Sequence, residues 1–211
     1  SYDREQLSQL YSLDRAVARR RAEHILNTVL RYCAAPTELC ALGFCVSVAH
    51  ARFMADFFTE RGLNALALTA QSPSEERQQA RGRLRQRELN FIFVVDLYNE
   101  GVDIPEVNTV LFLRPTESLT VFLQQLGRGL RLSEGKDCLT VLDFIGQANR
   151  HYDFESKFAA LLAPGSHSVA AELKQGFPSL PRGCYIQLEK VASRYVLNHI
   201  RQALNTRAGL I

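Results

Sequence analysis

Short apolar runs alternate with segments of helical periodicity through the middle of the chain. Five runs of five to seven residues are almost wholly apolar: Leu42–Val48, Ala65–Thr69, Phe91–Val95, Thr109–Leu113 and Leu139–Phe144. Such runs are typical of strands buried on both faces of a parallel sheet. Between them, helical spacing of apolar residues covers Ala49–Arg61, Ser74–Leu89 and Ser118–Leu130. The alternation predicts an α/β fold with an open, mainly parallel sheet flanked by helices and joined by right-handed crossovers.

The two ends of the chain follow a different pattern. Helical periodicity over Leu13–Leu30 predicts a leading helix that ends around Ala35 and Pro36. After Phe144 we predict a helix over His151–Leu162, a stretch containing Pro and Gly, and a small, mostly helical extension that ends in a helix over Glu189–Ala203. The predicted division is a leading helical segment over 1–36, the α/β domain over 37–148 and the start of an extension over 149–211.

Charge and composition narrow the picture only a little. The chain has 211 residues with 25 basic and 22 acidic side chains, a net charge of +3 and a pI near 8.7. This balance suits a partner made of phosphates without indicating one. The sequence has no secretory signal peptide and no run of eighteen apolar residues, and it begins with Ser rather than Met. We therefore expect a segment of a longer cytoplasmic protein.

The cysteines and histidines do not form a metal site by spacing. The five cysteines are odd in number, never form C-x-x-C and lie mostly in apolar runs, which is typical of reduced core thiols. The five histidines lack ligand spacing to each other or to cysteine. We therefore predict no metal ligands in this chain.

The segment Gln124–Arg131 carries the most informative chemistry. Arg128 and Arg131 lie three residues apart, so on a helix both guanidinium groups point to one side. A guanidinium is always charged and binds phosphate oxygens bidentately, which suits the charge of a γ-phosphoryl group in transfer. Taken alone, an R-x-x-R pair is far more often a pair of solvated arginines on a helix face.

A second polar segment follows the third apolar run. The residues Asp96–Pro105 continue directly from Val95, and in open α/β sheets ligands bind beyond the carboxyl ends of the strands. Gly101 permits close backbone approach, and the Asp103 carboxylate is suited to accept a hydrogen bond from a ribose hydroxyl. The alternative for Asp103 is a loop carboxylate that caps the turn before Pro105.

Together these segments resemble the C-terminal half of superfamily 2 helicases. Gly43–Ser47 matches motif IV, Glu100–Pro105 matches motif V, and Gln124–Arg131 matches the Q-x-x-G-R-x-x-R of motif VI, with Leu111–Ser118 between the last two. The resemblance covers roughly residues 40 to 145. It is closest to bacterial DEAD/DEAH-like helicases that continue into an additional C-terminal domain of unknown function, whose beginning is similar to Leu142–Gly146 and Gly176–Pro181.

The resemblance implies a RecA-like domain and a role for each matching residue. By this resemblance Arg131 is the arginine finger, Arg128 a second γ-phosphate contact, and Gln124 couples the nucleotide to the interdomain cleft. By the same resemblance Asp103 contacts the ribose, and Glu100 and Gly101 complete the turn of motif V. Gly127 of motif VI is a further nucleotide-binding residue. ATP and Mg²⁺ are the implied cofactors, bound mainly by a first RecA-like domain, which is also the implied partner.

Nucleic acid is the second implied partner, with DNA favoured over RNA. Ser47 and His50, at the turn into the first crossover helix, are expected to contact its phosphates with help from the helix amides. Thr69, Arg77, Asn99 and Thr116 are further candidates of this kind. For His50 the alternative is a residue at a helix start without a ligand. The arginines at 77, 81 and 85 follow an i, i+4 pattern that is also typical of a solvated helix face.

Missing motifs complete the sequence-based prediction. No G-x-x-x-x-G-K-[ST] occurs, since Gly135–Asp137 lacks the earlier glycine and the following Ser or Thr, and no D-E-x-[DH] follows a strand. We therefore expect the second motor domain of an ATP-dependent helicase or translocase, one that does not hydrolyse ATP alone. The main alternative is a non-catalytic docking or regulatory module of the same fold. A dehydrogenase or glycosyltransferase is disfavoured because no glycine-rich turn follows a strand.

Overall fold

The structure is a computed structural model of the 211-residue chain. It describes residues 15–33, 35–95, 106–114, 138–144, 154–162, 168–180, 186–188, 192–198 and 200. The chain divides into two compact units, Ser1–Gln147 and Ala148–Ile211. The leading helix α2, Arg15–Tyr32, belongs to the first unit.

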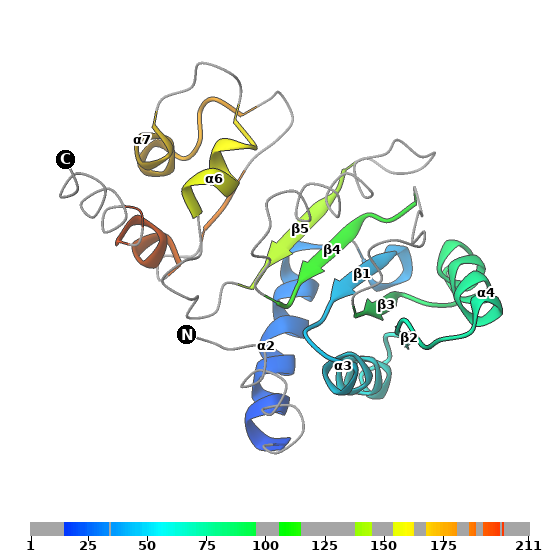
Figure 1. The fold of residues 1–211 in the computed structure, drawn as a ribbon. Coiled ribbons are helices and arrows are strands. Elements are labelled where there is room, and N and C mark those ends of the chain that lie inside the picture. The colour runs from blue at the N-terminus through cyan, green and yellow to red at the C-terminus, as the bar shows by residue number, and fades with distance from the viewer. Residues whose placement is uncertain are drawn as a thin grey trace. The chain divides into compact units, whose positions relative to one another are not determined.

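The first unit is built on a parallel five-stranded sheet (Figure 1). The strands are β1 Ala41–Phe44, β2 Ala65–Leu68, β3 Phe91–Val94, β4 Thr109–Phe112 and β5 Thr140–Asp143. Their order is β2-β3-β1-β4-β5, and every neighbouring pair is parallel and in full four-residue register. The predicted open parallel α/β sheet is therefore confirmed, with each strand shorter than the apolar run that predicted it.

One face of the sheet is covered by α2 and by α3, Val48–Glu60. Three phenylalanines form the centre of this layer, with Phe58 of α3 lying edge-on to Phe91 and Phe93 at ring distances of 4.9 and 5.3 Å. A Cβ built on Gly43 would lie 2.4 Å from the Phe93 ring. A side chain at position 43 would thus displace an aromatic ring of the core, so β1 takes glycine there.

The helix α4, Ser74–Arg85, packs against β3 and buries Ala80 and Leu84. It ends four residues before the predicted Leu89 because Arg87 adopts a left-handed conformation, with φ 63°. The N–H groups of Glu88 and Leu89 then both donate to the Arg83 carbonyl, at 2.9 and 3.2 Å. These bonds close the helix end and leave Leu89 buried beneath it.

Asparagines organise the amino edge of the sheet, where the strands begin. Asn90 precedes β3 and Asn108 precedes β4, the two neighbours of β1. The Asn90 amide donates to the Pro36 carbonyl at 2.8 Å, and the Asn108 amide donates to the Glu38 carbonyl at 2.7 Å. Both amides thereby hold the 3-10 helix η1, Pro36–Glu38, which leads into β1.

The second unit contains the short helices α6, Phe154–Ala159, and α7, Val169–Gln175, with further helical residues over 192–198. The stretch containing Pro and Gly did not predict α7, which Ser168 caps and Gly176 ends at φ 76°. The buried Glu172 carboxylate accepts from both the N–H and the hydroxyl of Ser179, at 3.1 and 2.6 Å. These bonds fold the segment after α7 back onto that helix.

Two global features of the described residues complete the fold. No helix among them is long and apolar enough to span a membrane. Cys33, Cys40, Cys45 and Cys138 are all free cysteines. Burial raises the pKa of Cys33 to about 11, although a hydrogen bond with the Thr109 side chain lowers it and Cys138 adds a smaller increase.

Candidate nucleic-acid and nucleotide site at the carboxyl edge

Polar residues follow β1, β2 and β4 at the carboxyl edge of the sheet. Ser47 comes three residues after the end of β1, Thr69 directly follows β2, and Arg114 comes two residues after β4. Since β3 lies between β1 and β2, the exits of Ser47 and Thr69 are two strand spacings apart, roughly 10 Å. Parallel topology therefore brings sequence-distant polar groups to the edge where ligands bind in such sheets.

Ser47 caps α3. Its hydroxyl accepts from the His50 N–H at 3.2 Å, and its backbone is extended, with φ −152° and ψ 164°. The strand that was expected to continue to Val48 therefore ends at Phe44, because residues 46 and 47 turn into the helix. Ser47 is half-buried, so part of this residue remains accessible at the helix start.

Thr69 and Ser72 form a tight turn after β2. The Thr69 N–H donates to the Ser72 hydroxyl at 3.1 Å, and the Gln71 N–H donates to the Thr69 hydroxyl at 3.2 Å. Thr69 has 8% exposure, whereas Gln71 is exposed. The threonine side chain thus shapes the turn that leads to α4 and leaves a small accessible surface of its own.

His50 is fully buried, unlike the exposed phosphate ligand that its position suggested. Its Nδ1 accepts from the Val46 N–H at 3.4 Å, which holds the same turn that Ser47 caps. Burial, with a smaller contribution from the positive charge of Arg21 on α2, lowers the pKa of His50 to about 3. The side chain is therefore neutral at physiological pH and offers no surface to a phosphate.

Arg77 and its neighbours lie on α4. Arg77 is half-buried, and its N–H donates to the Pro73 carbonyl at 3.1 Å. Two other arginines of this basic stretch pair with carboxylates: Arg85 with Glu106 at 2.8 Å and Arg83 with Glu88 at 3.6 Å. These pairs favour a solvated helix face over a continuous phosphate track for α4.

Arg114 is a residue of this edge that the sequence analysis did not single out. It has 4% exposure, and it lies near enough to the fully buried Cys45 to affect its titration. Burial raises the pKa of Cys45, and the Arg114 charge opposes that rise. The one marker in the sequence was a charged residue directly after the apolar run Thr109–Leu113, and the sequence did not show that this arginine is buried.

The remaining predicted site residues lie outside the described part of the chain: Asn99, Glu100, Gly101, Asp103, Thr116, Gln124, Gly127, Arg128 and Arg131. Val95 and Arg114 are the described residues directly before these two segments, and both lie at the carboxyl edge. Within the described ranges, no group of three or more His, Cys, Asp or Glu side chains is arranged to hold a metal ion.

Sequence comparison with known proteins finds helicases among the similar proteins. Over 127 residues the chain is 31% identical to the putative ATP-dependent helicase IRC3 of Saccharomyces cerevisiae, a match that covers 60% of this chain. It is 36% identical over 110 residues to the putative mitochondrial ATP-dependent helicase irc3 of Schizosaccharomyces pombe, covering 52% of this chain. In both cases the match spans 18% of the relative's length.

A solved structure shares the fold, and a family model matches the sequence. The C-terminal domain of the DEAD-box protein Dbp5 superposes with a TM-score of 0.51 at 13% identity, covering 67% of this chain and 76% of that one. The sequence model of the helicase conserved C-terminal domain matches residues 24–133, which is more than half of the chain. The chain therefore belongs to the helicase conserved C-terminal domain family.

Proposed function

We propose that this chain is the second motor domain of an ATP-dependent nucleic-acid helicase or translocase. The observation that carries the proposal is the family match over residues 24–133, a range that includes Gln124, Arg128 and Arg131. In this proposal the two arginines reach the γ-phosphate across a domain interface. Gln124 couples the nucleotide to that interface.

The nucleotide itself is assigned mainly to another domain. The 211-residue sequence contains no phosphate-binding loop of the G-x-x-x-x-G-K-[ST] type, so ATP and Mg²⁺ are held chiefly by a first RecA-like domain. ATP supplies the phosphoryl group whose transfer to water drives the motor. Glu100, Gly101, Asp103 and Gly127 complete the nucleotide site from this side, with Asp103 on the ribose.

The nucleic-acid grip is assigned to the carboxyl edge. Ser47 supports this because its hydroxyl lies at the exposed start of α3, where amide groups and the helix dipole favour phosphate. Thr69, Arg77, Asn99 and Thr116 extend the grip in this proposal. Opening and closing of the two motor domains changes the spacing between their nucleic-acid contacts and moves the protein along a strand. We expect this strand to be DNA rather than RNA.

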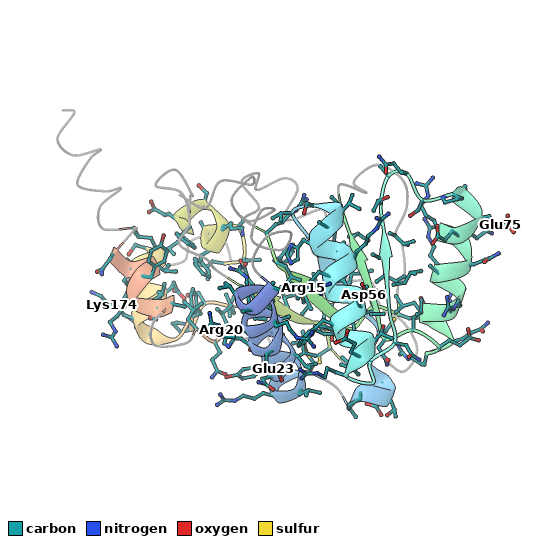
Figure 2. All side chains as sticks on the ribbon, turned by 90° about the horizontal axis from the view of Figure 1, so that it is seen from below. Arg15, Arg20, Glu23, Asp56, Glu75 and Lys174 are labelled. Atoms are coloured by element: carbon teal, nitrogen blue, oxygen red, sulfur yellow. The ribbon has the colours of Figure 1, made fainter. Side chains whose placement is uncertain are left out.

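The test is ATP turnover by the complete parent polypeptide with duplex DNA, single-stranded DNA, RNA or no nucleic acid. Arg131→Ala should reduce the stimulated turnover by a factor of about 10³ or more, as loss of an inserted arginine does in phosphoryl transfer. Nucleotide binding should stay within a fewfold of the parent value. The control is Arg20→Ala, an exposed arginine on α2 that should leave turnover unchanged (Figure 2).

Each outcome discriminates between the two classes of function. If one nucleic acid stimulates turnover, and Arg131→Ala abolishes this stimulation while Arg20→Ala preserves it, both the motor function and its nucleic-acid substrate are established. Near-normal turnover in Arg131→Ala would instead indicate a docking or regulatory module. Equal stimulation by RNA and DNA would contradict the expected preference for DNA.

A further inference from the structure

His50 bonds both residues of the turn between β1 and α3, Val46 with its imidazole and Ser47 with its backbone. The Val46 N–H donates to His50 Nδ1 at 3.4 Å, and the backbone N–H of His50 donates to the Ser47 hydroxyl at 3.2 Å. The Ser47 carbonyl in turn accepts from the Ala51 N–H at 3.0 Å. His50 therefore fixes the residue before Ser47 with its side chain and Ser47 itself with its backbone.

The protonation state of the imidazole follows from its surroundings. The ring has 0% exposure, and burial together with the Arg21 charge keeps the pKa of His50 near 3. A neutral imidazole that accepts at Nδ1 carries its proton on Nε2. At neutral pH it therefore accepts the Val46 N–H without competition from protonation.

Substitution by an apolar residue separates packing from positioning. Val46 has only 8% exposure, so a leucine at position 50 would keep the space filled and leave the Val46 N–H without its acceptor. Met54 lies one helical turn further along α3, is equally buried and belongs to the hydrophobic core. The two positions thus share a helix face and differ in their relation to the turn.

We propose that His50 is a positioning residue that holds the Val46–Ser47 turn in the orientation in which Ser47 contacts the nucleic-acid backbone. It acts through Ser47 and does not itself contact the phosphate. The proposal rests on the proposed function for the role of Ser47, and its structural part, the restraint of the turn, stands independently of that function.

The experiment compares His50→Leu, His50→Asn and Met54→Ala in the complete parent polypeptide. The readouts are the nucleic-acid concentration that gives half-maximal ATPase stimulation, the turnover at saturation and the melting temperature. His50→Leu should raise the half-maximal concentration about tenfold, the factor for one lost contact of ordinary strength, with saturated turnover within about twofold of the parent. His50→Asn, whose amide oxygen can accept from Val46, should restore most of this loss.

The control variant tests whether lower stability alone explains the effect. Met54→Ala should lower the melting temperature and leave the half-maximal concentration unchanged. A rise in Met54→Ala equal to that in His50→Leu would overturn the proposal, and so would equal defects in His50→Asn and His50→Leu. Parent affinity that weakens from pH 6 to pH 8 only when His50 is present would also overturn it, because that behaviour requires a charged imidazole at the phosphate.

Amide hydrogen exchange keeps the proposal testable if nucleic acid does not stimulate the parent protein. That result would contradict the proposed function alone. The Val46 amide should exchange at least about tenfold faster in His50→Leu than in the parent and should return close to the parent rate in His50→Asn. Parent-like protection of Val46 in His50→Leu would refute the positioning role whatever the ATPase result.

Discussion

The two edges of the parallel sheet use polar side chains differently. At the amino edge, Asn90 and Asn108 direct their amides to backbone groups of the segment that enters β1 or of neighbouring turns. At the carboxyl edge, Ser47 also bonds the backbone but stands half-buried at an exposed helix start. There the buried His50 side chain accepts a hydrogen bond from the turn, and this turn places Ser47 at the helix start.

The difference separates fold from function within one sheet. A side chain whose donor and acceptor both bind the chain's own backbone contributes to stability and has little capacity left for a ligand. A hydroxyl at a helix start can cap the helix and still lie beside a bound phosphate. Substitutions at the amino edge should therefore change stability, and substitutions at the carboxyl edge should change coupling to nucleic acid.

The largest effect on stability is expected from Asn108→Ala. This change removes the acceptor of the buried Cys40 N–H, at 3.1 Å, and the donor to the Glu38 carbonyl, at 2.7 Å. The free energy of unfolding of the 211-residue chain should fall by about 2 to 3 kcal/mol, as measured by urea denaturation. Asn27→Ala, at an exposed position on α2, is the control and should change it by less than about 0.5 kcal/mol.

Asn108→Ala also tests the distinction between the two edges, because a substitution at the amino edge should not change nucleic-acid binding. In the parent polypeptide below its melting temperature, Asn108→Ala should keep the parent's nucleic-acid concentration for half-maximal stimulation. A severalfold rise there, without a matching rise in Met54→Ala, would show that the amino edge also shapes the site.

A smaller effect is expected from pH, and it belongs to the carboxyl edge. The pKa of His50 is about 3 in the folded chain, whereas its ordinary value, taken for the unfolded chain, is 6.5. Between pH 6.5 and pH 3 the unfolded chain therefore binds a proton at this imidazole and the folded chain does not. Stability is therefore fully present above pH 6.5 and is lost as pH falls toward 3, by about 1.4 kcal/mol per pH unit. At pH 5 this amounts to about 2 kcal/mol relative to pH 8.

Urea denaturation at pH 8 and pH 5 measures this contribution. His50→Asn lacks the titrating group and should lose about 2 kcal/mol less than the parent between these pH values. Asn108→Ala should keep the parent's pH dependence, because its contacts involve no titrating side chain. An identical pH dependence in the parent and in His50→Asn would contradict the low pKa of this imidazole.

The fold was accessible from the sequence because its signals are strong and local. Continuous apolar runs such as Phe91–Val95 predict buried strands, and their alternation with helical segments predicted a parallel sheet, although not the order of its strands. Element ends were less accessible. The left-handed Arg87 that ends α4 has no marker in the sequence, and α7 is a seven-residue helix whose ends are set by Ser168 and Gly176 in a stretch that looked like a loop.

The site residues could be predicted from the sequence only where a motif or a predicted element end marks their position. Motif IV includes Ser47, and the predicted helix start placed His50 at the same turn, but the sequence could not say which of the two faces solvent. That distinction depends on α2 and on the core beneath α3, which bury position 50 through contacts distant in sequence. Arg114 was missed for the same reason, since an arginine after a strand is usually solvated and only tertiary packing buries it.

Substitutions of Ser47 should have the smallest effect on stability. They also test most directly whether the two edges of the sheet differ in function. Ser47→Ala removes the cap of α3 and should lower the free energy of unfolding by about 1 kcal/mol. Ser47→Asp keeps a good cap, because its carboxylate accepts from the same N–H, and should stay within about 0.5 kcal/mol of the parent. It also places a negative charge where a phosphate is expected. Nucleic-acid affinity should therefore rank parent, Ser47→Ala, then Ser47→Asp, although stability ranks the two variants in the opposite order.

Fluorescence anisotropy with labelled DNA and RNA at two salt concentrations checks this ranking. The gap between Ser47→Asp and the parent should narrow as salt rises, because screening weakens the repulsion between carboxylate and phosphate. If Ser47→Asp binds as tightly as the parent at low salt, no phosphate approaches position 47. The serine would then serve α3 as the asparagines serve β1, and the distinction between the two edges would have to rest on residues other than Ser47.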